Sequence, residues 1–424
     1  MGSYLNPGNF SFRGSLRSKI YVDKSKLIAK TNEVLCTEQK YICVSRPRRF
    51  GKSMAANMLA AYYDRSENTE DLFQNLAISG EKSYEENLNQ YDVIKINMQE
   101  FLSMAGTIEK MLEMLKDYLV VDFEEAYPEV RFRDKNNLIQ TMKDVFSYTK
   151  CPFVILIDEW DCLFREYKQD KEAQKKYLDF LRAWLKDKDY IAMAYMTGIL
   201  PIKKYGSHSA LNMFTEYSMT DPGELAEYFG FTEPEVSAIC EKYGMSFEEA
   251  KTWYDGYQLV AHRQWKDECY SMYNPKSVVE AMLRHKFGTY WNQTETYEAL
   301  KIYIQMDMDG LKASVIRMLT GDSVPINTGT FSNDMTTFAT KDDVLTLLVH
   351  LGYLTYNSID GTVSIPNKEV SQEYINAIST MNWHGVADSV EASRKLLEAL
   401  WQMDADAVAA GIEKAHEEIS IMCY

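Results

Sequence analysis

Gly51, Lys52 and Ser53 form a tripeptide whose chemistry suits the binding of phosphate groups. The apolar run Tyr41–Val44 precedes it and is typical of a buried strand, and Met54–Tyr63 follows with helical character. Backbone N–H groups at the start of a helix lack intrahelical partners, and glycine lets them approach a phosphate closely. The lysine could reach the β- and γ-phosphates, and the serine hydroxyl could bind Mg²⁺. This layout therefore predicts a P-loop.

The loop before this tripeptide departs from the usual pattern G-x-x-x-x-G-K-[ST]. Arg46 stands where that pattern has its first glycine, and the loop contains one proline and three arginines. We expect a nucleotide to contact the whole loop and the start of the helix, namely Arg46, Pro47, Arg48, Arg49, Phe50, Gly51, Lys52, Ser53 and Met54. For the arginines, a solvated surface without a ligand is the alternative interpretation.

A second chemical element follows later in the chain. Pro152–Ile157 is a fully apolar run that ends in Asp158 and Glu159, which is the arrangement of a Walker B motif. A buried strand delivers its last side chains to the edge of a parallel sheet where ligands bind. We expect Asp158 to hold Mg²⁺ together with Ser53, and Glu159 to orient and polarise the attacking water as the catalytic base. Asp161 is expected to cap the next helix.

Strands and helices alternate through the first half of the chain, which predicts an α/β fold with a three-layer parallel sheet of the P-loop NTPase (AAA-like) type. Tyr190–Met196 is a further strand that ends at Thr197. In ATPases with a glutamate after the Walker B aspartate, this strand lies between the Walker A and Walker B strands. Thr197 would then face the γ-phosphate as a catalytic sensor. Phe214–Met219 is a candidate fifth strand.

The residues before the first strand could cover the base of a nucleotide. Asn6–Ser18 is polar and rich in glycine and serine, so we expect a lead-in loop. Asp23 is a good N-cap for a short helix that buries Leu27 and Ile28. Because this segment could contact adenine, Asp23 is included among the cofactor-binding residues. A capped packing helix is the alternative interpretation.

The pattern of predicted strands and helices changes after the first half of the sequence. We expect four parts: a P-loop ATPase domain (1–220), a helical domain (221–340), a winged-helix-like segment (341–370) and a helical tail (371–424). The third part combines a helix at Asp342–Leu351 with two short strands, Tyr353–Tyr356 and Thr362–Ile365. An Asp-Gly pair between these strands favours a hairpin. Helix plus hairpin is the outline of a winged helix.

The composition excludes several classes of protein. A hydrophobic content of 46% excludes a disordered chain, and a net charge of −16 disfavours a general nucleic-acid coat. Seven cysteines without a C-x-x-C pair disfavour a disulfide framework and a zinc site. No stretch approaches the ~18 apolar residues of a membrane span. We expect a cytoplasmic protein without membrane contact and leave a protein partner or self-association open.

Several motifs together resemble the bacterial AAA-ATPase-like family. The motifs are Tyr21-Val22-Asp23-Lys24, the octet RPRRFGKS at 46–53 and Leu156-Ile157-Asp158-Glu159. Further matches are Thr197-Gly198, Tyr228-Phe229-Gly230-Phe231-Thr232, Trp253-Tyr254-Asp255-Gly256-Tyr257, Tyr273-Asn274-Pro275 and Ile365-Pro366-Asn367.

The resemblance implies that Lys52, Ser53 and Asp158 bind ATP and Mg²⁺, that Glu159 serves hydrolysis, and that Arg46 is a family trait. Members often carry a PD-(D/E)xK nuclease-like domain behind the ATPase part. The helical tail shows no strands of that kind, and we expect this domain to be absent from the chain.

The sequence therefore predicts an ATP-binding protein whose Mg²⁺-dependent hydrolysis drives or signals a conformational change. Two alternatives remain, a winged-helix nucleic-acid-binding module regulated by ATP and a nucleotide-binding switch without turnover. The acidic and apolar character of Asp342–Leu351 speaks against the first, and Glu159 speaks against the second.

Overall fold

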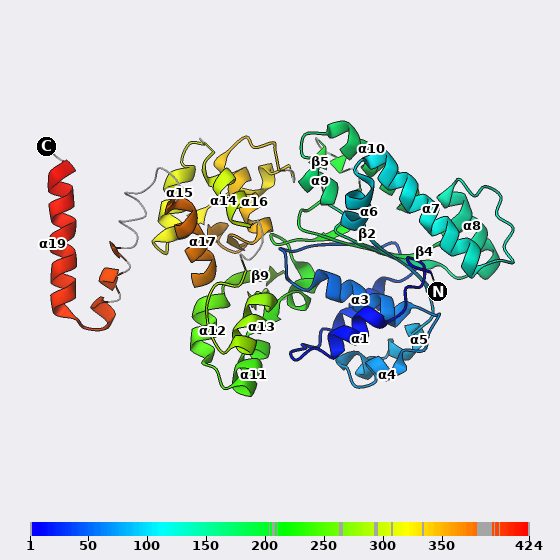
Figure 1. Cartoon of the computed structure of the whole chain (residues 1–424), viewed down its shortest axis with the longest axis horizontal. Helices are drawn as coiled ribbons and strands as arrows, with labels where there is room; N and C mark the ends of the chain where they lie inside the picture. Colours follow the sequence, from blue (N-terminus) through cyan, green and yellow to red (C-terminus); the bar gives the residue numbers. More distant parts are fainter. Residues whose placement is uncertain are drawn as a thin grey trace.

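The computed structural model describes residues 2–202, 204–205, 208–209, 211–262, 266–291, 296–306, 308–332, 335–379 and 392–422, without 394 and 398. Figure 1 shows an elongated molecule in which the first half of the chain lies beside the residues that follow. Helix α19 (Ala405–Met422) stands apart from both.

A five-stranded parallel sheet forms the centre of the first half. Its strands are β1 (Tyr41–Ser45), β2 (Asp92–Asn97), β3 (Phe153–Asp158), β4 (Ile191–Gly198) and β7 (Thr215–Tyr217). Their order is β2-β3-β4-β1-β7. Strand β4 therefore lies between the strand before the GKS tripeptide and the strand that ends in Asp158, as predicted. The α/β parallel fold and the fifth strand are confirmed.

Helices cover both faces of this sheet and give three layers (Figure 1). One face carries α1 (Phe10–Leu16), α3 (Lys52–Tyr63), α4 (Glu70–Phe73) and α5 (Tyr84–Asn87). The other carries α6 (Met98–Ala105), α7 (Ile108–Ala126), α8 (Leu138–Thr149) and α10 (Lys171–Leu185). Helix α7 buries an apolar stripe, and Thr107 caps the helix by accepting a hydrogen bond from Lys110 N.

The extreme N-terminus runs antiparallel along the edge strand β2. Lys95 N donates to Tyr4 O at 2.9 Å, and Asn6 N donates to Val93 O at 2.7 Å. The Asp122 carboxylate of α7 accepts from the backbone N–H groups of Tyr4 and Leu5 at 2.7 and 3.0 Å. These contacts cover the β2 edge of the sheet.

Two predictions for the N-terminal segment are wrong. The expected loop contains α1, because Phe12 is buried and its ring stacks on Phe73 with centroids 5.1 Å apart. Asp23 does not cap a helix, since α2 (Lys26–Val34) has Ser25 at its N-cap position. The Asp23 carboxylate instead accepts from Ser25 N at 2.8 Å and Ala77 N at 2.7 Å, which ties this segment to the loop after α4.

The part predicted to be helical contains both helices and strands. Its helices are η2 (Gly223–Tyr228), α11 (Glu233–Tyr243), α12 (Phe247–Tyr254), α13 (Pro275–Arg284), α14 (Thr296–Ile304) and α15 (Leu311–Leu319). Strands β8 (Phe231–Thr232), β10 (Glu268–Tyr273) and β9 (Tyr257–Ala261) form an antiparallel sheet in that order. The expectation of helices alone is therefore wrong, because alternate residues of β9 bury their side chains against the core.

A second small sheet contains the predicted hairpin. Strand β12 (Thr355–Asn357) pairs antiparallel with β13 (Thr362–Ser364), which also pairs with β11 (Val324–Pro325). Helix α16 (Lys341–Leu351) precedes the hairpin and buries the side chains from Asp343 to His350. The elements are those expected, whereas their assignment as a winged helix stays a prediction.

The tail begins with α17 (Lys368–Ser379) and contains α19. The predicted helical character at 380–391 and 423–424 lies outside the described residues. Across the described part of the chain, no helix combines the length and apolarity that a membrane crossing requires.

Candidate functional site

The tripeptide lies at the junction of strand β1 and helix α3, as predicted. Gly51 is the N-cap residue of α3 and has φ +91°, a left-handed conformation that side chains other than glycine rarely adopt. The loop can therefore turn directly into the helix, and Lys52 and Ser53 occupy its first turn.

Lys52 folds back over its own loop. Its ammonium group donates hydrogen bonds of 2.9 Å to Arg46 O and to Pro47 O. The side chain is buried, and burial lowers the pKa of Lys52, whereas the nearby charges of Glu159 and Asp158 oppose this shift. The site thus contains a cation with little water around it and two carbonyl groups as partners.

Ser53, Asp158 and Thr197 meet at one point. Ser53 Oγ donates to Asp158 Oδ2 at 2.5 Å, and the Thr197 hydroxyl donates to Asp158 Oδ1. These side chains come from the start of α3 and the ends of β3 and β4, which lie side by side in the sheet. The parallel-sheet argument from the sequence predicts this meeting.

Glu159 follows directly and forms an ion pair with Arg165 of the short helix α9 (Cys162–Glu166). Its backbone has φ +53°, which is uncommon for a residue other than glycine. Burial and the neighbouring Asp161 raise the pKa of Glu159, whereas Arg165 and Lys52 lower it. A carboxylate in this environment is largely removed from water yet flanked by two cations.

Asp161 stands at the N-cap position of α9 but does not cap it through its side chain, so that expectation is wrong. Its Oδ2 accepts from Ile199 N at 3.0 Å and Leu200 N at 2.8 Å, just beyond β4. Arg165 Nε lies 3.4 Å from the same oxygen. The carboxylate therefore joins α9 to the end of β4.

Arg46 and Pro47 belong to the loop but do not line the cavity described below. The Arg46 side chain is fully buried, and its Nη1 donates to Ser45 O at 3.0 Å and to Tyr217 O at 2.7 Å. Its guanidinium carbon lies 5.6 Å from the ring centroid of Phe229, and burial lowers the pKa of Arg46 to about 10. Arg46 therefore braces the loop against β7 and the residues after η2, a position different from the one expected for a phosphate ligand.

Arg49 reaches the second half of the molecule. Its Nη1 donates to Tyr290 O at 3.0 Å and to Trp291 O at 2.7 Å. The N–H groups of these same two residues donate to Glu369 Oε1, at the start of α17, at 2.5 and 2.9 Å. We call this arrangement of Arg49, the backbone of Tyr290 and Trp291, and Glu369 the 290–291 clamp.

Phe50 adds to the same connection. Its ring meets the Tyr257 ring edge to face with centroids 5.1 Å apart, and its carbonyl accepts from Gly230 N at 3.0 Å. Tyr257 in turn donates through its hydroxyl to Gly352 O at 2.9 Å. A side chain on Gly352 would collide with Pro47, since a Cβ there would lie 2.8 Å from Pro47 Cβ. The loop at residues 46–50, called the arginine loop from here on, therefore packs against the second half of the chain through Pro47, Arg49 and Phe50.

A cavity of about 930 Å³ opens between the loop, the segment before α2 and helix α13. Predicted residues in its lining are Arg48, Arg49, Phe50, Gly51, Lys52, Ser53, Met54 and Glu159. Three predicted residues, Asp158, Thr197 and Asp23, do not line the cavity. Asp158 contacts Ser53 and Thr197, and Asp23 accepts from the backbone of Ala77.

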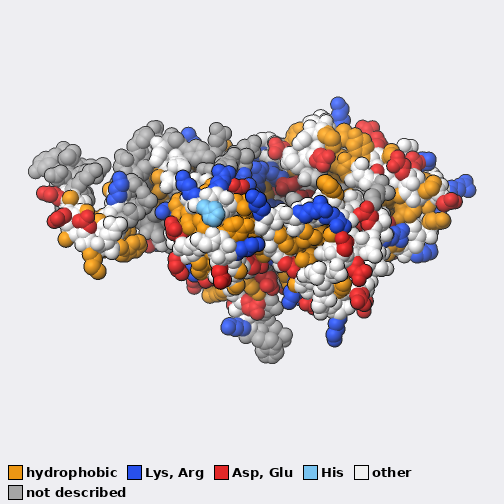
Figure 2. Space-filling model, turned by 60° about the horizontal axis from the view of Figure 1, so that its bottom comes forward, with side chains coloured by type: hydrophobic (Ala, Val, Ile, Leu, Met, Phe, Trp, Pro, Cys, Tyr) orange, Lys and Arg blue, Asp and Glu red, His pale blue; other side chains and the backbone are white. Residues whose placement is uncertain are grey.

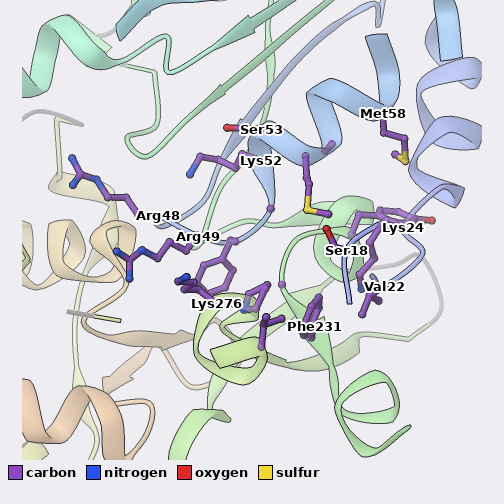
Figure 3. A pocket seen from close by; sticks show the side chains of 18 of the residues that line it. Ser18, Val22, Lys24, Arg48, Arg49, Lys52, Ser53, Met58, Phe231 and Lys276 are labelled. Atoms are coloured by element: carbon purple, nitrogen blue, oxygen red, sulfur yellow. The ribbon is translucent and has the colours of Figure 1, made fainter. Parts of the chain in front are cut away.

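The cavity is positively charged although the chain is acidic. Its charged side chains are six cations, Lys24, Arg48, Arg49, Lys52, Arg165 and Lys276, and two acids, Glu159 and Glu166. Figure 2 shows Lys and Arg side chains gathered beside a hollow in the middle of this face. In Figure 3, Arg48, Arg49 and Lys52 lie toward one end, and Ser18, Val22, Lys24 and Phe231 lie toward the other. Such a focused field favours an anionic ligand.

The lining includes Lys24, Arg165, Phe231 and Lys276, which the sequence analysis did not name as site residues. Local signals in the sequence could have found three of them. Phe231 lies within a motif of the family resemblance, and Lys276 follows Asn274, which caps α13 by accepting from Lys276 N at 3.0 Å. Arg165 lies one helical turn beyond Asp161, a spacing that allows an ion pair.

The family model described as "Predicted AAA-ATPase" matches residues 12–207. A curated relative from Azotobacter chroococcum, an uncharacterized protein in the vnfD 5' region, is 24% identical over 287 residues. The match covers 65% of this chain and 51% of that protein, so the chain spans about half the length of this relative.

Two solved structures have a distant overall likeness. The ORC2 protein of Aeropyrum pernix with ADPNP and ADP is 8% identical, with a TM-score of 0.35 over 89% of this chain and 97% of that one. The ORC1 protein of Aeropyrum pernix with DNA is 12% identical, with a TM-score of 0.28 over 91% of this chain and 99% of that one. Neither likeness is close enough to carry an argument. Residues 12–207, which contain the GKS tripeptide and the Asp158-Glu159 pair, are thus similar to the AAA-ATPase-like family.

Proposed function

We propose that this protein binds ATP with Mg²⁺ in the cavity beside the GKS loop and hydrolyses it. The observation that carries the proposal is the meeting of Ser53 and Thr197 on the Asp158 carboxylate, next to the buried cation of Lys52. Phosphoryl transfer depends on positioned cations, a metal held by a hydroxyl and a carboxylate, and a group that orients water. Each of these parts has a candidate within this site.

The oxygen atoms of Ser53 and Asp158 suit Mg²⁺. This ion is bound by one or two carboxylates together with waters and substrate phosphates. Among the described residues, no three His, Cys, Asp or Glu side chains form a cage for a metal, which fits an ion that arrives with its nucleotide. When bound, Mg²⁺ would neutralise charge on the β- and γ-phosphate oxygens.

Lys52 would exchange its present partners for phosphate. Its two bonds of 2.9 Å end on neutral backbone carbonyls of the loop. Phosphate oxygens are stronger acceptors because they carry charge, and a buried cation is attracted to them more strongly than an exposed one. Lys52 also lines the cavity in which the phosphates would bind.

Glu159 would act on water. In hydrolysis, the water oxygen bonds to the γ-phosphorus, the bond to the β–γ bridging oxygen breaks, and ADP leaves. The Glu159 carboxylate accepts a hydrogen bond from that water and takes up its proton. Thr197 holds the Asp158 oxygen that Ser53 does not contact, and so fixes the orientation of the carboxylate beside the γ-phosphate.

The far end of the cavity suits a base. Ile20, Tyr21, Val22, Met58 and Phe231 give it an apolar and aromatic lining. Figure 3 shows Val22, Met58 and Phe231 on the side away from Arg48 and Lys52. We therefore propose that this segment contacts adenine through its apolar side chains. Asp23 stabilises the segment through its hydrogen bonds with Ser25 N and Ala77 N.

The connections of the arginine loop support a conformational role. Arg49 and Phe50 belong to the loop that would surround the phosphates, and both contact residues beyond 220. A change of the loop on binding or hydrolysis would reach the 290–291 clamp directly. We propose that the nucleotide state is passed on by this route.

The nucleic-acid-binding alternative gains little support. A recognition helix must expose its side chains to a groove, whereas α16 buries every residue from Asp343 to His350. The net charge of −16 also opposes binding to phosphate backbones.

The proposal is tested with purified wild type and Lys52→Ala. Thermal stabilisation by ATP and phosphate release are measured with Mg²⁺ and with a chelator. We expect stabilisation of about 2.7 kcal/mol when ATP is at 100 times its dissociation constant, and phosphate release only with Mg²⁺. Lys52→Ala should lose both. Equal stabilisation of the two proteins would refute the P-loop assignment, and wild type that binds without turnover would leave a nucleotide-binding switch.

A further inference from the structure

Arg165 occupies a position that no motif explains. Its side chain is only 8% exposed, it lines the cavity, and it contacts both Glu159 and Asp161. An arginine removed from water is costly unless its partners are well placed. Here the two partners flank it, one on each side.

One of these partners is rigidly anchored. Asp161 is fully buried, and two backbone N–H groups beyond β4 donate to it. The close packing depends on Gly198, because a Cβ there would lie 2.9 Å from Asp161 Oδ1 and 2.7 Å from the Trp160 indole nitrogen. The end of the central strand β4 thus fixes Asp161, whose Oδ2 pairs electrostatically with Arg165 Nε at 3.4 Å.

The other partner is Glu159, which needs such support. Its left-handed backbone, φ +53°, costs free energy and persists only where the surroundings enforce it. Trp160 N donates to Thr197 O at 3.0 Å and Cys162 N donates to Glu159 O at 3.0 Å, so the backbone on both sides is held. The side chain is held by Arg165 through Oε2, which leaves Oε1 for a water molecule.

We propose that Arg165 is the positioning residue of Glu159: it transmits the fixed geometry of Asp161 and β4 to the carboxylate that orients the attacking water. This inference rests on the proposed ATP hydrolysis. Arg165 does not bind nucleotide in this role, and its contribution lies in the rate of the chemical step. A guanidinium suits the task because its planar fork can contact two carboxylates at once, whereas an ammonium is a single point of charge.

Two other roles make different predictions. A brake that keeps Glu159 away from water until ATP arrives would make removal of Arg165 raise the rate. A purely structural ion pair would make its removal lower stability without a specific effect on turnover.

The test compares wild type, Arg165→Met and Arg165→Lys, with Arg317→Met as a control at an exposed arginine on α15. Binding of ATP–Mg²⁺ is measured by nucleotide titration, and kcat and KM are measured by phosphate release. We expect Arg165→Met to lower kcat by roughly 10²-fold, the lower range of general-base effects, with binding and KM within about twofold. Arg165→Lys should recover part of kcat, and Arg317→Met should match wild type.

A second comparison keeps the proposal testable if Arg165→Met does not fold. Arg165→Lys is made in wild type and in Glu159→Gln. The lysine variant should lower kcat in wild type and have little further effect once the carboxylate is gone, because positioning acts only through Glu159. A raised kcat, a kcat equal to wild type, or an undiminished loss in the Glu159→Gln background would overturn the inference. Failure of the proposed function itself would be visible separately, as absence of binding or turnover in wild type.

Discussion

Arg49 and Glu369 both bind the backbone of the same two residues, Tyr290 and Trp291. Arg49 donates to the carbonyls of Tyr290 and Trp291, and Glu369 accepts from their N–H groups. Arg49 also has a left-handed backbone, φ +70°. The 290–291 segment is thereby connected at once to the candidate nucleotide loop and to α17.

Arg49→Ala should uncouple the two halves of the molecule. Hydrogen bonds to charged groups contribute about 1.5–3 kcal/mol each, so residues 286–291 and 368–379 should exchange amide hydrogens faster. In wild type, ATP should slow exchange in these peptides, and in Arg49→Ala it should bind but lose this distant effect. Mass-spectrometric hydrogen exchange measures both. Arg17→Ala, at an exposed arginine, is the control; a variant that loses only ATP affinity would make Arg49 a phosphate ligand instead.

Arg46→Ala should affect folding more than ligand binding. The substitution removes two hydrogen bonds to backbone carbonyls and the contact with Phe229 from a fully buried position. Large-to-small changes at such positions cost roughly 2–4 kcal/mol. Urea unfolding should report this loss, while the folded variant should bind ATP with nearly unchanged affinity. A large loss of affinity at unchanged stability would restore Arg46 to the phosphate site.

Glu159→Gln and Asp158→Asn should separate chemistry from metal binding. The first keeps the size of the side chain and the Ser53–Asp158 contact, so ATP–Mg²⁺ should bind about as well, with turnover reduced by roughly 10²–10⁴-fold. The second removes the charge aimed at Mg²⁺ and should weaken the metal-dependent part of binding. Titrations with and without Mg²⁺, together with phosphate release, distinguish these outcomes. Unchanged turnover in Glu159→Gln would mean that another group acts as the base.

Gly256→Ala should disrupt the packing of two motifs far apart in sequence. A Cβ at Gly256 would lie 1.9 Å from Pro366 O, and the backbone has φ +105°. Asn367 also donates to Asp255 O at 2.8 Å, so the two segments cannot simply separate. We expect a loss of several kcal/mol or failure to fold, as for overpacked and strained sites. Gly80→Ala is the matched control, since a Cβ there meets nothing within 4 Å. Thermal unfolding that is equal in both would contradict the structure at this contact.

The sequence predicts the central sheet well because its information is local. Apolar runs mark β1 and β3, and the residues at their ends follow from the geometry of parallel strands. The position of β4 between them is predicted from Glu159, because ATPases with a glutamate after the Walker B aspartate have this strand order. Helix α1 escaped prediction because it is seven residues long and its burial rests on Phe12.

The remaining features depend on distant contacts. Arg49 and Trp291 lie 242 positions apart, and no local pattern reveals that they meet. The side chain of Arg46 is charged and therefore looks like a ligand or a surface residue, whereas its surroundings are backbone carbonyls and an aromatic ring. Strands β9 and β10 were missed because the pattern of so short a segment does not distinguish a strand from a helix. Their pairing with each other is what makes them strands.

The N-terminal residues that run along β2 have a practical consequence for handling the protein. A parallel sheet exposed at its edge offers unpaired N–H and C=O groups to any other chain. Here Tyr4, Leu5 and Asn6 occupy that row, and Asp122 fastens them. Trimming the first six residues, or crowding them with an affinity tag, would uncover the edge of β2, a strand in which four of six residues are buried. Aggregation after such trimming would then originate at this edge, even with the candidate nucleotide pocket intact.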